Sequence, residues 1–83
     1  MQIPMREVER MLNDCAPGWT IKAKKHRNWV YYKDLIYREL PLGDHGKRTN
    51  PEIQFTKVRH MVDYFRISRG CANKHFPHMF KDA

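Results

Sequence analysis

The spacing between apolar residues changes twice along this chain, and that change constrains the fold more than any other feature. Near the N-terminus, over residues 4–15, apolar residues recur three or four positions apart, as on one face of a helix. Further on they alternate with polar residues, as in half-buried strands, and later they return to helical spacing. The pattern therefore predicts a helix on each side of a group of strands.

The first helix is expected over residues 4–15. Pro4 suits the first turn of a helix, and Ala16-Pro17-Gly18 is typical of a helix end. Its apolar stripe consists of Met5, Val8, Met11, Leu12 and Cys15.

Three strands are expected over residues 19–25, 29–32 and 35–40. These segments are rich in β-branched and aromatic residues, or alternate between apolar and polar residues. Lys33-Asp34 is expected to form a tight turn between the second and third strands, because only two residues separate them. The sequence thus predicts a three-stranded antiparallel meander.

A polar, turn-rich stretch from Pro41 to Asn50 predicts a loop, and a second helix is expected over residues 51–68. Asn50-Pro51-Glu52 opens this helix with a capping residue, a proline in the first turn and an early acid. Gly70 marks the end of the helical segment.

The resulting order is α-β-β-β-α, which places the chain in the α+β class. A three-stranded antiparallel sheet with both helices on one face buries both apolar stripes together and leaves the other face free. Double-stranded-RNA-binding domains share this layout. The 83 residues suffice for one domain, expected over residues 1–70, with a C-terminal tail over residues 71–83.

The distribution of charge indicates a polyanionic partner. Sixteen Lys and Arg oppose nine Asp and Glu, for a formal net charge of +7. Residues 20–48 carry +5 of this, residues 1–19 carry −1 and residues 49–83 carry +3. Basic side chains neutralise phosphates and aromatic rings accept unpaired bases, so the interleaved aromatic residues of the middle segment favour RNA. The alternative is a basic surface over an aromatic core.

Aromatic residues of the second strand fall on both faces of the sheet. Trp29 and Tyr31 are two residues apart and share one face, whereas Val30 and Tyr32 share the other. One pair belongs to the core, and the other is available to stack on bases or to contact a protein. The pattern alone leaves both assignments open.

Cysteine usage and hydropathy bear on the compartment. No apolar run reaches the length of a membrane span, and the first ten residues lack the apolar stretch of a signal peptide. Cys15 and Cys71 are therefore expected to be free thiols in the cytoplasm. The spacing of Cys71, His75 and His78 fits no closed zinc site, and a fourth ligand would have to come from a distant residue such as Cys15. Neither a metal nor another cofactor is therefore expected.

Several short motifs occur in a fixed order along the chain. They are Gly18-Trp19 after the first helix, His26-Arg27-Asn28-Trp29, Leu40-Pro41 followed by His45-Gly46-Lys47, and Thr56-Lys57-Val58-Arg59-His60-Met61-Val62 closing with Ile67-Ser68. In their order and spacing these motifs resemble those of HicA-type toxins, and the resemblance extends over roughly residues 3–68.

HicA-type toxins are similar in fold to double-stranded-RNA-binding domains, cleave messenger RNA, and are silenced by a HicB-type antitoxin encoded beside them. The resemblance therefore implies an endoribonuclease with an RNA substrate and an antitoxin partner. The family's active histidine, which usually follows Gly-Ser, falls on His26, which here follows Lys24-Lys25.

These residues suggest a metal-independent mechanism. His26 is expected to act as the general base that takes the proton of the 2′-hydroxyl, because a histidine titrates near neutrality. His45 is the candidate acid or phosphate ligand, and either histidine is otherwise a solvated loop residue. The expected RNA-binding residues are Lys24, Lys25, Arg27, Lys47 and Arg48.

Two other functions remain open from the sequence. The absence of Gly-Ser before His26 favours a non-catalytic RNA-binding module with the same fold, whereas the clustering of His26 with basic residues favours the nuclease. The third alternative is a protein-interaction domain whose basic face docks an acidic partner.

Overall fold

Strands β2 (Thr20–Ala23), β3 (Arg27–Tyr32) and β4 (Leu35–Pro41) form the antiparallel sheet that the alternating apolar pattern predicts. The computed structural model describes residues 1–41, 51–77 and 80. Along the chain the elements are β1 (Gln2–Pro4), α1 (Met5–Cys15), β2 (Thr20–Ala23), β3 (Arg27–Tyr32), β4 (Leu35–Pro41), β5 (Glu52–Gln54), α2 (Phe55–Tyr64) and α3 (Arg69–His75).

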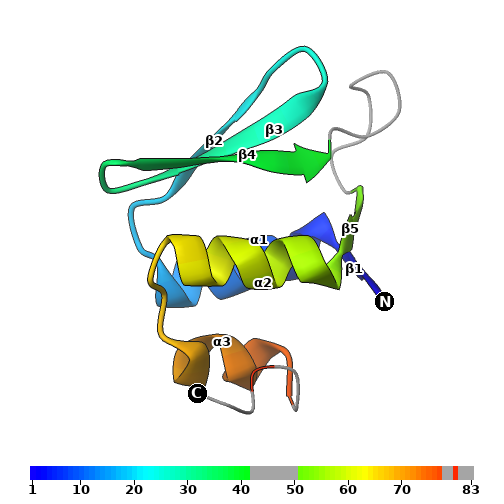
Figure 1. Ribbon diagram of the computed structural model, residues 1–83. Helices are drawn as coiled ribbons and strands as arrows, with labels where there is room; N and C mark the ends of the chain where they lie inside the picture. The colour runs from blue at the N-terminus through cyan, green and yellow to red at the C-terminus, as the bar shows by residue number, and fades with distance from the viewer. Residues whose placement is uncertain (42–50, 78–79, 81–83) are drawn as a thin grey trace.

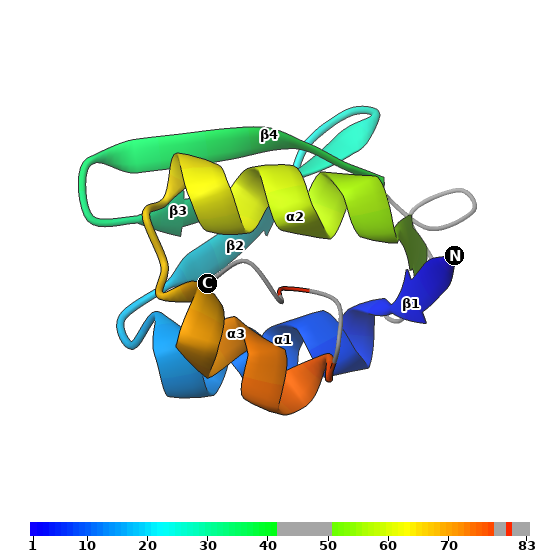
Figure 2. The ribbon, with the colours of Figure 1, turned by 60° about the horizontal axis from the view of Figure 1, so that its bottom comes forward.

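The helices α1 and α2 lie on one face of the sheet, and α3 lies beyond them, on the side away from the sheet (Figures 1 and 2). The expected α-β-β-β-α arrangement is therefore confirmed. The core fills the space between the sheet and the helices. Its fully buried side chains include Val30 and Leu40 from the sheet, Val8 from α1 and Val58 from α2.

A β-bulge interrupts the pairing of β3 with β4. Val30 pairs with Tyr37 but Asn28 pairs with Leu40, so β4 holds one extra residue opposite Trp29. Because of this extra residue, Tyr37 and Leu40 both point into the core although they are three positions apart. The side-chain amide of Asn28, the buried polar residue of the core, donates a 3.0 Å hydrogen bond to the carbonyl of Pro41.

A short ribbon, β1 paired antiparallel with β5, brings the starts of both helices together. The backbone N–H of Met5 donates to the carbonyl of Pro51, and that of Phe55 donates to the carbonyl of Met1. Neither helix has a side-chain cap, so these bonds satisfy N–H groups that a helix start otherwise leaves free. The predicted start of the second helix at residue 51 is wrong, because residues 52–54 pair with the N-terminus instead.

The C-terminal part of the chain packs against the helices. The expected boundary at residue 70 falls inside α3, where Arg69 donates two hydrogen bonds to the Asp63 carboxylate of α2. Phe76 and Phe80 are buried, and their rings lie 6.4 and 5.3 Å from the ring of Phe55. This segment therefore covers one side of the helical layer.

The expectation of two free thiols is wrong in this structure. Cys15, at the end of α1, and Cys71, in α3, form a disulfide across 56 residues of sequence. The sequence did not predict this pairing, because its apolar pattern does not show that residues 69–75 form a helix packed beside α1. Among the described helices, none is both long and apolar enough to cross a membrane.

Candidate nucleic-acid interface

The outer face of the sheet, turned away from the helices, carries both aromatic and basic side chains. In the β2–β3 pairing Lys22 lies opposite Trp29 and Thr20 lies opposite Tyr31. Trp29 and Tyr31 are only partly buried, whereas Val30 between them is fully buried in the core. The choice that the sequence left open is thus decided in favour of Trp29 and Tyr31 as the outward pair.

Tyr32, the last residue of β3, faces the core. Tyr32 packs edge-on against Phe65 of the segment after α2, with the ring centroids 5.7 Å apart. Its ring is therefore not available on the outer face.

Cations lie against the rings of the outer face. The Nζ atom of Lys24 lies 5.0 Å from the centre of the Trp29 ring, and the guanidinium carbon of Arg38 lies 4.8 Å from it. The Nζ atom of Lys22 lies 5.8 Å from the centre of the Tyr31 ring. These distances are in the range of cation–π attraction. We refer to Lys22, Lys24, Trp29, Tyr31 and Arg38 as the outer-face cluster.

His26 lies in the tight turn between β2 and β3, next to this cluster. The backbone N–H of Lys24 donates a 2.8 Å hydrogen bond to the carbonyl of Arg27 and closes the turn around Lys25 and His26. All four residues are exposed. The Arg27 guanidinium also donates to the carbonyl of His26 at 3.1 Å, which restrains the turn.

Lys24 joins the turn to the sheet face, since it starts the turn and also reaches the Trp29 ring. An imidazole, five nearby cations and two aromatic faces are therefore continuous along one surface. Such a surface can hold a phosphate beside His26 while unpaired bases stack on the sheet.

Three of the expected site residues, His45, Lys47 and Arg48, lie outside the described residues. Their roles as acid and as phosphate contacts stay predictions. Pro41, the last described residue before this segment, pairs with Arg27.

A shallow open pocket of about 330 Å³ is lined by Arg27 together with residues of β4, β5 and α2. Its lining has mixed charge, and Lys57 is paired with Glu39 across it, Nζ to Oε1 at 3.7 Å. Glu52 adds a second carboxylate. Two carboxylates repel a phosphate, so the outer-face cluster suits an RNA backbone better than this pocket does.

Sequence reasoning missed Lys22 and Arg38. The signal for Lys22 was present, because it shares the alternation of Lys24 and faces Trp29 in any hairpin closed near residues 25–26. Arg38 had no such signal, because its place beside Trp29 depends on the bulge in β4.

Comparison of the chain with models of known families, with curated proteins and with solved structures gives no match. The resemblance to HicA-type toxins thus depends on the short motifs alone.

Proposed function

We propose that this protein binds single-stranded RNA along the outer face of its sheet and cleaves it beside His26, as a HicA-type toxin does. The observation that supports the proposal is the continuity of the exposed His26 turn with the outer-face cluster through Lys24. The cluster offers both of the contacts that an unpaired strand needs, cations for phosphates and rings for bases.

RNA has to compete with the cations that already lie against Trp29. A cation–π contact at an exposed position contributes about 0.5–1 kcal/mol, whereas a base stacked on an aromatic ring contributes about 1–3 kcal/mol. The displaced Lys24 or Arg38 then meets a phosphate instead of a ring. Exchange of the contact is therefore favourable, and the free protein holds both cations near the path of the backbone.

In the proposed cleavage, His26 takes the proton of a 2′-hydroxyl, and the resulting oxygen attacks the adjacent phosphorus. Lys25 and Arg27, which flank His26, stabilise the charge of the phosphorane. The 5′-oxygen leaves with a proton supplied by an acid, for which His45 is the candidate. The products are a 2′,3′-cyclic phosphate and a free 5′-hydroxyl.

The second candidate function is RNA binding without cleavage. One observation favours it: among the described residues, none forms a side-chain hydrogen bond with the imidazole of His26. General bases are commonly oriented by a partner group. In this case the outer-face cluster retains its role and His26 is one more polar contact.

A HicB-type antitoxin as protein partner, and action in the cytoplasm on messenger RNA, complete the proposal. The antitoxin and the messenger RNA substrate follow from the motif resemblance. The antitoxin would need acidic groups to match the cations around His26.

The test is cleavage of a single-stranded RNA by the purified wild type, by His26→Ala and by His60→Ala. His60 is an exposed histidine on α2 and serves as the matched control. Loss of a general base reduces the cleavage rate by about 10²–10⁴-fold, whereas truncation of an exposed imidazole leaves stability within about 0.5 kcal/mol. A chelator is expected to leave the activity of the disulfide-bonded wild type unchanged.

Cleavage that is lost in His26→Ala, kept in His60→Ala, and yields 2′,3′-cyclic phosphate ends supports the nuclease. If wild type and His26→Ala cleave equally, or if neither cleaves but both bind, the nuclease is excluded and the binding module stands.

A further inference from the structure

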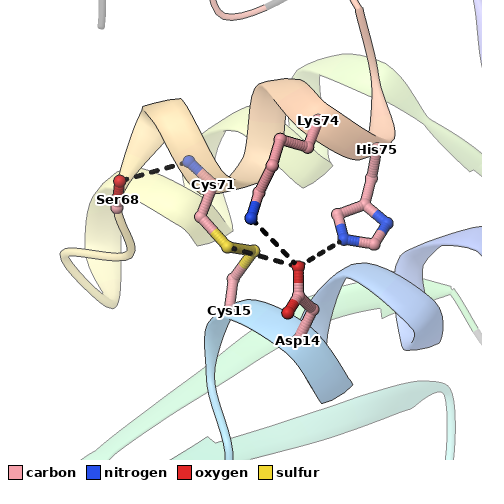
Figure 3. Close-up of a disulfide and its surroundings, with 6 residues drawn as sticks. All are labelled: Asp14, Cys15, Ser68, Cys71, Lys74 and His75. Carbon is pink, nitrogen blue, oxygen red and sulfur yellow. Dashed lines mark hydrogen bonds and ion pairs between the residues drawn. A yellow bond between two sulfur atoms is a disulfide. The ribbon is translucent and has the colours of Figure 1, made fainter.

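A second group of reactive side chains lies on the far side of the molecule, where α1 meets α3 (Figure 3). The carboxylate of Asp14 is at its centre: its Oδ2 atom lies 2.9 Å from Nε2 of His75, 3.7 Å from Nζ of Lys74 and 3.6 Å from Sγ of Cys71. The Cys15–Cys71 disulfide lies directly beside it.

Two short helical segments fix this arrangement. Asp14 and Cys15 are the last two residues of α1. Cys71 and His75 are four residues apart on α3 and therefore project from the same face of that helix. Ser68 caps α3 by accepting a hydrogen bond from the backbone N–H of Cys71, which holds this residue in place.

We propose that reduction of the disulfide converts this cluster into a Zn²⁺ site whose four ligands are Asp14, Cys15, Cys71 and His75. The proposal is independent of the RNA function. It also departs from the expectation of no metal, because the fold places Cys71 and His75 of α3 beside the end of α1.

The positions of the ligand atoms fit a tetrahedral site. One ligand atom each from Asp14, Cys15 and Cys71 lie within 4.8 Å of one another, and Nε2 of His75 is already next to the carboxylate. Zinc bound to sulfur at about 2.3 Å and to nitrogen or oxygen at about 2.0–2.2 Å separates its ligand atoms by roughly 3.3–3.8 Å. Opening of the disulfide and side-chain rotations supply the difference.

The charge of the surroundings fits as well. Two thiolates and one carboxylate exceed the charge of Zn²⁺ by one, and the ammonium of Lys74 beside Asp14 offsets it. Thiolate and imidazole ligands select zinc over magnesium or calcium.

The redox step balances with a thiol reductant. Two molecules of a thiol reduce the Cys15–Cys71 bond, giving two protein thiols and one reductant disulfide. Zn²⁺ then replaces the two thiol protons, which are released to solvent. Either the disulfide or the metal would thus hold α3 on α1, the disulfide in an oxidising compartment and zinc in a reducing one.

The test uses the full chain and Zn²⁺ in competition with a chromophoric chelator, before and after reduction with a phosphine. We expect the reduced protein to bind one Zn²⁺ per chain and the oxidised protein to bind none. Co²⁺ in its place is expected to give the visible bands of tetrahedral coordination and a thiolate charge-transfer band.

Variants assign the ligands. We expect Asp14→Asn and His75→Ala each to lower the Zn²⁺ affinity of the reduced chain. The loss of an outer-sphere partner typically costs about 10- to 100-fold in affinity, and the loss of a direct ligand should cost at least as much. Cys71→Ser is expected to abolish tight binding. His60 is an exposed histidine on α2, so His60→Ala is expected to bind Zn²⁺ as tightly as the wild type.

Circular dichroism measures whether the reduced chain unfolds and whether Zn²⁺ refolds it. Refolding on addition of Zn²⁺ supports the site, because a structural metal contributes its binding energy to folding. The proposal is overturned if the reduced chain binds no Zn²⁺, or if Asp14→Asn and His75→Ala both bind as tightly as the wild type.

Discussion

Trp29 is the residue through which the cations and the bases of a bound strand would meet. Its ring is half-buried on the outer face of the sheet, with Lys24 and Arg38 within 5.0 Å of its centre. Because a stacked base contributes about 1–3 kcal/mol, Trp29→Ala is expected to weaken binding of single-stranded RNA by about 5- to 150-fold. Fluorescence anisotropy of a labelled oligonucleotide measures this change.

Tyr64→Ala is the matched control for Trp29→Ala. Tyr64 is an aromatic residue with 44% of its surface accessible, but it lies on α2. RNA affinity is expected to stay close to that of the wild type. Equal losses in both variants would show that the outer face holds no preferred stacking position.

At the scale of the elements, the link between α1 and β2 requires a backbone conformation that only glycine adopts easily. Gly18 has φ +93°, and the backbone N–H of Trp19 donates to the carbonyl of Ala16 across Pro17-Gly18. A Cβ at Gly18 would meet nothing within 4 Å, so a substitution there tests backbone strain alone.

Gly18→Ala is expected to lower the free energy of unfolding by about 1–2 kcal/mol. Gly70 is the matched control, because it lies in α3 and an added Cβ would be 3.6 Å from Oγ of Ser68, an ordinary contact. Gly70→Ala is expected to raise stability by about 0.5–1 kcal/mol. Urea denaturation of the two oxidised variants measures both, and a stable Gly18→Ala protein would contradict the strained turn.

The elements that could be predicted from the sequence are those whose apolar pattern is local. The helix over residues 5–15 and the three strands follow from periodicity, and they were predicted to within a few residues. β5 was not predictable, because Glu52–Gln54 forms a strand only through pairing with Gln2–Pro4. The β4 bulge and the disulfide likewise depend on contacts between distant segments.

The same distinction applies to the candidate site. His26 and its basic neighbours were recognisable because they are adjacent in the sequence and lie in one turn. The outward direction of Trp29 depends on which face of the sheet the helices cover, and the alternation within the strand does not show this. Arg38 joins this residue across the irregular strand pair.

For the whole molecule, the helical layer separates two surfaces of different chemistry. The sheet face and the His26 turn lie on one side of α1 and α2, and the disulfide cluster lies on the other (Figures 1 and 2). Changes at Asp14 or His75 are therefore not expected to alter direct contacts with RNA. The two proposals can be tested separately in one protein.

If the protein binds RNA as proposed, its net charge of +7 makes the affinity dependent on salt. The slope of that dependence reports how many cations act on phosphates. If each of the cations near the turn and on the sheet face meets one phosphate, log–log plots of affinity against salt have a slope of up to about −3.5, at about −0.7 per phosphate for a single strand. Those described cations are Lys22, Lys24, Lys25, Arg27 and Arg38.

Lys25→Ala is expected to reduce the magnitude of this slope by about 0.7, because Lys25 is exposed beside His26 and loses one phosphate contact. Lys74→Ala removes the same charge from α3, where 67% of the lysine side chain is accessible but no RNA contact is expected. The salt slope of Lys74→Ala is therefore expected to match that of the wild type. Titrations of RNA in matched buffers over a range of salt concentrations measure both slopes.

Equal reductions of the slope in both variants would mean that only the net charge matters. An affinity for RNA that does not change with salt would instead favour an acidic protein as the partner of this face.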